Sequence, residues 1–516
     1  MATTHDSARE VRAETTPLLG QSTCRESNQE DEPTSKISTR SVLIIVGICI
    51  IVIDFGNYLS FAPQIDILEQ IVCKRHGNAK EPLPRPGHAS GPDCKGDEIQ
   101  AELAILVGWM AFCNQVPGII LALPYGFAAD KFGRKPVLLL SLMGLILEEI
   151  AVRIILGMSD RIPAEAIWAA PLLQLIGGGP QMATSMAFTI ITDVFPASQR
   201  SSIFFRLSAI ILLGELLATP SGALAMSWTP WFPFLAGVAF ELIGLAATFA
   251  LPETMPPPPQ QEAPLEERRV LSDDQEEARK QVFSTRSLLQ KWSHFGRHGI
   301  SAKGMINILL VTASFLMASI GREALRFVVQ YASKKFSWTI AQSSLLITVK
   351  GVINLLSLLF LLPQLSFLML KHMSTVRVDL VLVQGSVFLL TVGTAIMAFS
   401  QQSGAFTAGI VSFSLGWGYY AALRSLATYL VLPSQAGALN TAIALAQSFG
   451  AMVSGPVLAL SFRWGLAMGG TWVGLPYMVA SILFAAAGGL VLCIRLPRQL
   501  ERTRTGLEST DADVSS

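Results

Sequence analysis

The chain has 516 residues, of which 51% are hydrophobic and 15% are charged. A soluble domain carries roughly 25% charged residues, so much of this surface faces something other than water. The formal net charge is +1, which gives no electrostatic basis for nucleic acid as a partner.

The N-terminal residues 1–40 are polar, charged and low in aromatics, and we expect them to form a disordered cytosolic tail. This tail is too long and too acidic for a signal peptide. One short pattern within it, built on Glu14, Leu18 and Leu19, resembles an acidic dileucine signal that sorting adaptors use to direct cargo to the vacuole or lysosome. Chance occurrence is an equal alternative.

Apolar stretches close to the roughly 20 residues that cross a bilayer recur along the rest of the chain. We expect an all-α membrane protein with about twelve transmembrane helices in two sets of six. Their expected limits are 42–62, 102–124, 136–157, 165–192, 203–226, 231–251, 305–331, 341–364, 378–399, 405–431, 437–461 and 474–495. The first set occupies residues 41–251 and the second 304–495, with a charged cytosolic linker at 252–303 and a cytosolic tail at 496–516.

Lysine and arginine predict the orientation, because they accumulate on the cytosolic side. They occur in alternate loops, including 125–135 and 365–377, and in the linker and the C-terminal tail. Both termini are therefore predicted to be cytosolic. The long loop 63–101 then lies outside the cell or in an organelle lumen, where Cys73 and Cys94 could form a disulfide or remain free thiols.

The loop between spans two and three reads Gly126-Phe-Ala-Ala-Asp130-Lys131-Phe-Gly133-Arg134-Lys135. Gly126 allows helix ends to approach closely, and Gly133 permits a tight turn. Asp130 can pair with a basic side chain, while Arg134 and Lys135 keep the loop on the cytosolic side. The segment resembles the G-x-x-x-D-x-x-G-R-[KR] signature of the major facilitator superfamily. The alternative is a generic cytosolic turn.

This resemblance implies a fold of two six-helix bundles around a central cavity, each built from inverted repeats. It also implies that the signature loop is a conformational latch, which favours one of the two access states. The resemblance extends to fungal members, which often carry a Thr-Pro-Leu-Leu segment in the N-terminal tail, here at residues 16–19.

Fungal facilitators of this type often export drugs or secondary metabolites by proton-coupled alternating access, and the resemblance implies the same function. Two alternatives stay open: uptake or vacuolar exchange of a nutrient or organic anion, and a membrane sensor that transports nothing. The plasma membrane is the expected location, with the vacuolar membrane as the alternative.

Ionisable side chains within spans are costly to bury and therefore suggest function. Their positions are Asp54, Glu148, Glu149, Glu215, Glu241 and Lys350 near mid-bilayer, Arg322, Glu323 and Arg326 in the outer part of span seven, and Arg424 towards the cytosolic side of span ten. The resemblance implies that spans one, four, seven and ten line the cavity and that three, six, nine and twelve are peripheral. It therefore favours Asp54, Glu215, Lys350, Arg322 and Arg424 over Glu148, Glu149 and Glu241.

Two acids in this favoured group, Asp54 and Glu215, are candidate proton carriers. A carboxyl group in a low-dielectric site favours its neutral form, so it can change charge as the cavity opens to either side. The alternative is a static ion pair with Lys350. That lysine could instead attract an anionic substrate.

The basic residues of spans seven and ten have two readings each. Arg322 and Arg326 are four residues apart on one helical face, with Glu323 close to Arg326. They form either part of a gate or a helix-end pair near the outer surface. Arg424 binds either a carboxylate substrate or neighbouring carbonyl groups.

Span four contains Gln174 and Gln181 around a Gly-Gly-Gly-Pro cluster at residues 177–180. This cluster should weaken or bend the helix. The two glutamines then either meet substrate or belong to a packing interface of small residues.

The chain shows no signature of catalysis or of nucleotide binding: H-E-x-x-H, G-x-S-x-G and the P-loop are all absent from it. We therefore expect a transporter and not an enzyme, with no cofactor or metal.

Overall fold

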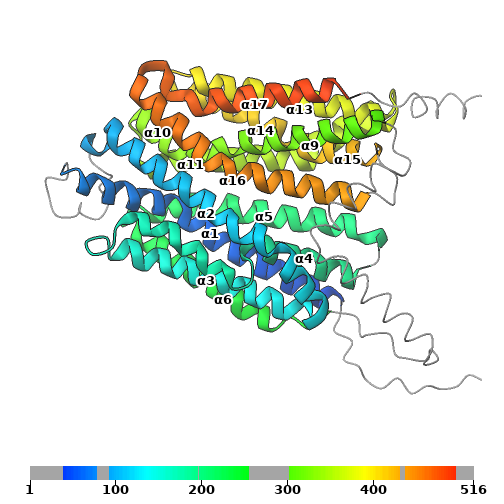
Figure 1. Cartoon of the computed structure of the whole chain (residues 1–516), viewed down its shortest axis with the longest axis horizontal. Coiled ribbons are helices and arrows are strands. Elements are labelled where there is room, and N and C mark those ends of the chain that lie inside the picture. The colour runs from blue at the N-terminus through cyan, green and yellow to red at the C-terminus, as the bar shows by residue number, and fades with distance from the viewer. Residues whose placement is uncertain (1–38, 78–91, 196, 255–301, 431–435, 495–516) are drawn as a thin grey trace, which may run out of the picture. The chain divides into compact units, whose positions relative to one another are not determined.

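The computed structural model describes residues 39–77, 92–195, 197–254, 302–430 and 436–494, and nearly all of them are helical (Figure 1). Most of the expected linker (residues 255–301), the C-terminal tail, and the sorting pattern at Glu14, Leu18 and Leu19 lie outside the described residues. From Thr39 onwards the described residues belong to one compact unit.

The first set of helices comprises α1 to α6. Its members are α1 (Thr39–Arg75), α2 (Asp97–Phe132), α3 (Arg134–Gly157), α4 (Gly179–Val194), α5 (Ala197–Ala225) and α6 (Trp231–Phe249), with short 3-10 helices η1 (Pro92–Lys95) and η2 (Ala164–Leu175). Within this set α1 packs along α5 and α6, and α3 packs against η2 and α4.

The second set comprises α9 to α17. Its members are α9 (Ala302–Arg322), η3 (Glu323–Phe327), α10 (Val328–Phe336), α11 (Ile340–Leu356), η4 (Ser357–Leu361), α12 (Leu362–Leu370), α13 (Thr375–Phe399), α14 (Ser403–Leu415), η5 (Gly416–Gly418), α15 (Tyr419–Thr428), α16 (Ala436–Met468), η7 (Gly470–Gly474) and α17 (Leu475–Leu492). The two sets touch mainly where α16 packs on α2 and α11 packs on α5.

Eight helices among the described residues are long and apolar enough to cross a membrane. They coincide with the expected spans one, two, six to nine, eleven and twelve. Span three is not among the eight because it carries three charged residues, Glu148, Glu149 and Arg153. Spans four and ten are not among them because non-α segments interrupt them. In span five the apolar stretch among the fully described residues is Ile210–Ala225, within the continuous helix α5. The count of twelve therefore remains a prediction.

The expectation of one long loop at 63–101 was wrong, because α1 continues to Arg75 and α2 already begins at Asp97. The extension is helical because apolar residues such as Leu68 and Val72 remain buried along it. At 1.5 Å per residue, α1 is roughly 55 Å long, which exceeds the roughly 30 Å of hydrocarbon. Its last turn therefore lies beyond the hydrocarbon, where Lys74 can pair with Asp160 at 2.7 Å.

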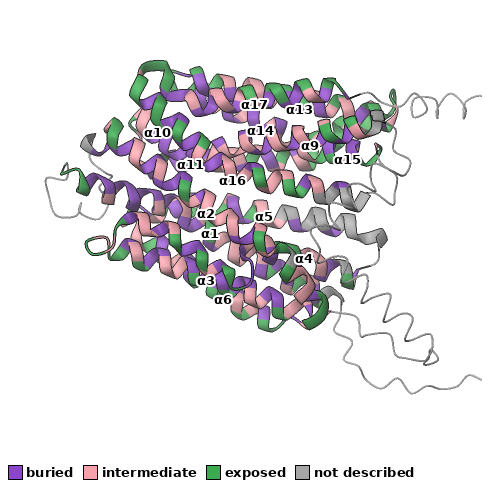
Figure 2. Cartoon of the chain, viewed as in Figure 1, coloured by how far each residue is buried: buried purple, intermediate pink, exposed green. Residues whose placement is uncertain are grey.

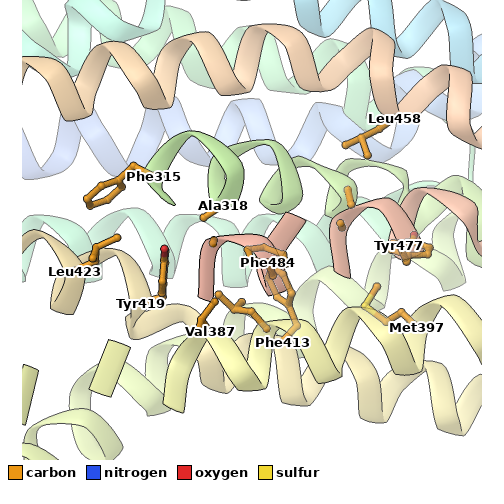
Figure 3. Close-up of a cluster of buried hydrophobic side chains, with 14 of the residues drawn as sticks. Phe315, Ala318, Val387, Met397, Phe413, Tyr419, Leu423, Leu458, Tyr477 and Phe484 are labelled. Carbon is orange, nitrogen blue, oxygen red and sulfur yellow. The ribbon is translucent and has the colours of Figure 1, made fainter. Parts of the chain in front are cut away.

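Buried side chains follow the faces that the helices turn towards one another (Figure 2). In the second set, aromatic residues dominate: Phe315, Phe413 and Phe484 pack together with Val387, and the rings of Phe413 and Phe484 are 5.9 Å apart (Figure 3). Burying such side chains contributes about 1.5–3 kcal/mol each relative to exposure in water, although lipid reduces this difference. One apolar cluster lies mainly in the second set, whereas another joins the two sets by packing Val329 and Ile340 with residues of the first, such as Phe234.

Candidate functional site

A cavity of about 350 Å³ lies between the two sets of helices. Its walls come from α1 and α5 of the first set and from α9, η3, α11 and η5 of the second. Its charged lining residues are Asp54, Glu215, Arg322, Glu323, Arg326 and Lys350. Five of these are residues that the sequence analysis selected, and four of them, Asp54, Glu215, Arg322 and Lys350, belong to the group that the resemblance favoured.

One ion pair crosses the cavity from one set to the other. The Lys350 ammonium on α11 lies 2.5 Å from the Glu215 carboxylate on α5, and both side chains are largely buried. Lys350 also lies over the ring of Trp417, 6.0 Å from its centre. The static pairing considered for Lys350 therefore involves Glu215. Asp54 forms no ion pair within 4 Å in the part of the chain that the structure describes.

Two arginines from the end of α9 and from η3 share one carboxylate. The Arg326 guanidinium donates to Glu323 at 2.8 Å, whereas Arg322 is 3.6 Å from the same residue. Arg322 lies over the ring of Tyr420 at 5.3 Å. Because both arginines line the cavity, the pair is part of the site and does not simply cap a helix at the outer surface.

Three candidates lie outside this cavity. Gln174 donates to Glu148, and Gln181 donates to Gln115 at 2.6 Å. The exposed Arg424 donates to Gln447 at 3.1 Å. The structure therefore does not bring them to the same site as the charged group above.

The predicted weak point of span four is a full interruption of the helix. η2 ends at Leu175 and α4 begins at Gly179. The intervening glycines and Gly179 itself have positive φ angles, with Gly177 at 93°. Left-handed backbone of this kind suits glycine, which explains why the cluster breaks the helix instead of only bending it.

The signature loop joins α2 to α3 through a network of charges. The Arg134 guanidinium bonds Asp130 at 2.5 Å and Asp193 at 3.2 Å. The backbone N–H groups of Arg134 and Lys135 donate to the Glu253 carboxylate at 2.9 and 3.2 Å. These N–H groups belong to the first turn of α3, where a carboxylate is favoured by the helix dipole.

Glycine is required at position 133 of this loop. Gly133 has φ 106°, and a Cβ built there would collide with the carboxylate of Glu253. Sequence reasoning missed Glu253 as a partner of the signature. The only signal was its place directly after span six, in the segment Leu251-Pro252-Glu253-Thr254. Gly126, by contrast, has open space around it.

At the other end of the helices, a disulfide joins Cys73 at the end of α1 to Cys94 in η1, with the Cα atoms 5.3 Å apart. The neighbouring Lys95 bonds the buried Glu69 at 2.7 Å. It also donates to Ser333 of the second set at 2.6 Å. The sequence analysis did not select Lys95 or Glu69, because it treated this segment as a loop.

Further polar contacts join the two sets near this disulfide. Gln330 donates to the carbonyl oxygen of Gln100 at 2.7 Å, and Lys334 pairs with Asp97 at 2.8 Å. All of these residues lie at the ends of α2 and α10 that face the disulfide. Polar bonds therefore link the two sets at this end of the helices.

Comparison with known protein families agrees with this fold of two sets of helices. The sequence profile of the Major Facilitator Superfamily matches residues 44–455. The chain belongs to this superfamily. It is therefore an integral, multi-pass membrane transporter that binds small-molecule substrates, and not an enzyme.

Relatives with related sequences carry names that describe export. The chain is 32% identical over 484 residues to the MFS efflux pump atnC of Emericella nidulans, covering 92% of each chain. It is 30% identical over 456 residues to the efflux pump ustT of Aspergillus flavus, covering 88% of each chain. Among solved structures it resembles a D-xylose–proton symporter, with a TM-score of 0.58 and 14% identity over 89% of this chain and 98% of that one. This last likeness shows the major facilitator fold.

Proposed function

We propose that this chain is a secondary active transporter that exports a small organic solute by alternating access, driven by a proton gradient. The observation that carries the proposal is the central cavity, to which both sets of helices contribute charged side chains. A cavity between two mobile halves is what alternating access requires. The names of the relatives, which are efflux pumps, support the outward direction.

Asp54 and Glu215 are our candidates for the coupling groups. Glu215 is held by Lys350, so taking up a proton would release that lysine and weaken the link between α5 and α11. Asp54 lines the same cavity and has no ion-pair partner among the described residues, so its charge is compensated only by protonation or by a bound cation. Both would change charge as the cavity changes access.

A second candidate function is transport of an organic anion. Lys350, Arg322 and Arg326 place three cationic groups from the second set in the cavity wall. Arg322 is only weakly engaged by Glu323, at 3.6 Å, and is available to bind a carboxylate. This reading supports uptake or vacuolar exchange as well as export. The sensor reading has no comparable observation in its favour.

The signature loop is proposed as the latch of one access state. Its bonds to Asp193 and Glu253 tie the ends of α2, α3, α4 and α6 together as one rigid block. Asp130→Asn should keep the protein in the membrane but lower transport, because Arg134 loses a charged partner at 2.5 Å. Normal transport by this variant would exclude the latch role.

We also propose that both termini are cytosolic and that the protein works in the plasma membrane, with the vacuolar membrane and adaptor binding through Glu14, Leu18 and Leu19 as the alternative. The loop charges support this orientation. Protease accessibility in intact cells tests it, because a tail cleaved from outside would reverse the topology.

Flux in proteoliposomes tests the central proposal. An imposed pH gradient and a panel of organic anions, organic cations and neutral hydrophobic compounds would be applied to the parent, Asp54→Asn and Glu215→Gln. We expect gradient-driven flux in the parent and its loss in at least one variant. Asp160→Asn, which removes an exposed carboxylate at the end of α3, is the matched control. If the flux depends neither on the gradient nor on the two substitutions, the protein is a facilitator and the two acids are structural. If no compound of the panel is transported, the sensor function is favoured.

A further inference from the structure

A second group of charged residues lies inside the first set of helices, away from the central cavity. Glu148, Glu149 and Arg153 project from α3, and Glu241 projects from α6. None of them lines the cavity. Glu148 is 5% exposed and Glu241 is fully buried. These acids lie in peripheral spans and were ranked low in the sequence analysis. Two of them, Glu148 and Glu241, are nevertheless buried.

The single cation of this group, Arg153, is bound to partners other than Glu148 and Glu241. The Arg153 guanidinium bonds the Glu149 carboxylate at 2.5 Å, the Ser60 hydroxyl at 2.8 Å and the backbone oxygen of Phe234 at 2.9 Å. It also lies over the ring of Phe234 at 4.3 Å. Arg153 therefore pairs with Glu149, and none of its hydrogen bonds within the described residues goes to Glu148 or Glu241.

Glu241 has no partner of its own. Both of its carboxyl oxygens are buried without a hydrogen bond in the part of the chain that the structure describes. Helix α1 covers Glu241 and keeps water away from its carboxyl group. The two helices cross at Gly56 of α1 and Gly237 of α6, where their backbones are in direct contact. A buried carboxylate without a donor is strongly disfavoured.

Glu148 has one neutral partner, the side-chain amide of Gln174 in η2. The backbone oxygen of Gln174 accepts from Gly178 at 2.9 Å, within the interruption of span four. The electrostatic neighbours of Glu148 and Glu241 are Glu149, Arg153 and each other. Three carboxyl groups therefore face one guanidinium, which leaves two negative charges if every acid is ionised.

We propose that this acidic group, Glu148, Glu149 and Glu241, is a proton-binding site separate from the central cavity, and that Glu241 holds the proton. A proton fits better than a metal ion, because no cluster of at least three acid, histidine or cysteine side chains within the described ranges is arranged to bind a metal. The site contacts the interruption of span four through Glu148 and Gln174. It does not depend on the direction of transport or on the role of Asp54.

Infrared spectroscopy of the purified protein in lipid nanodiscs at neutral pH tests the proposal. Glu241→Gln keeps the shape of the protonated acid, so the variant should fold. The parent-minus-variant spectrum should show the loss of one protonated-carboxyl absorption. Glu165→Gln, which removes a carboxylate paired with Arg75, should instead lose only carboxylate absorption.

Loss of carboxylate absorption alone in Glu241→Gln would overturn the proposal, because Glu241 would then be ionised. A thermal stabilisation by sodium over choline that disappears in Glu241→Gln would also overturn it, in favour of a cation site. The infrared spectrum of Glu148→Gln tests the same group in a second way. With Glu148 neutral, the protonated-carboxyl absorption of Glu241 should remain at neutral pH but disappear at a lower pH than in the parent, because a neighbouring negative charge that favours the protonated form is gone. These spectra are independent of flux, so the site can fail while the proposed transport stands, or the reverse.

Discussion

Breaking the Glu215–Lys350 pair should have a large and asymmetric effect on stability. The ammonium and carboxylate are 2.5 Å apart, and the side chains are 18% and 5% exposed. Removing one partner of a buried pair leaves the other charge uncompensated, which costs about 3–5 kcal/mol. Lys350→Met strands the more buried charge and should lower the free energy of unfolding by about that amount. Glu215→Gln should cost less, because Lys350 faces the cavity.

The double variant Glu215→Gln/Lys350→Met should recover most of the loss, since it removes both charges together. Unfolding in mixed micelles, followed by tryptophan fluorescence, measures all three variants. Lys334→Met is the matched control: it also removes a lysine that links the two sets, but its partner Asp97 is 60% exposed, so the cost should be about 0–1 kcal/mol. Equal losses for Lys350→Met and Lys334→Met would refute the claim that the central pair is buried and strongly coupled.

Three further predictions address the loop, the disulfide and the cavity boundary. Gly133→Ala should destabilise the protein by about 1–3 kcal/mol and lower flux, because alanine is strained at this φ; unchanged thermal stability would contradict the loop geometry. Alkylation of the denatured chain, followed by mass spectrometry, should modify four cysteines before reduction and all six after it; six at the start would exclude the bond between Cys73 and Cys94. Arg322→Gln should impair flux in the vesicle assay, whereas Arg424→Gln should not; equal losses would place Arg424 in the substrate path.

The sequence located most of the helices because they depend on local patterns. Runs of apolar residues mark the spans, and a charge inside a run is conspicuous. Asp54, Glu215 and Lys350 are therefore visible without coordinates. Their convergence followed from the family resemblance, which supplied the order of helices around the cavity.

What the sequence could not provide is pairing between distant residues. Arg134 and Glu253 are 119 positions apart, and nothing in their spacing shows that they bond. Glu241 was set aside because its span is peripheral, although its burial without a partner depends on how α1 crosses α6. The helical extension of α1 was missed because charged residues there resemble a loop until their partners are known.

The distribution of polar contacts indicates how the two sets would move. Contacts between the sets gather near the disulfide, where Lys95 bonds Ser333 and Lys334 pairs with Asp97. The signature loop, at the opposite ends of the helices, bonds residues of the first set, such as Asp193, among the residues that the structure describes. Rocking the sets apart at the disulfide end would therefore break the first group. The disulfide holds η1 against the end of α1. Lys95, which follows Cys94, is therefore held in position for its bond to Ser333 of the second set.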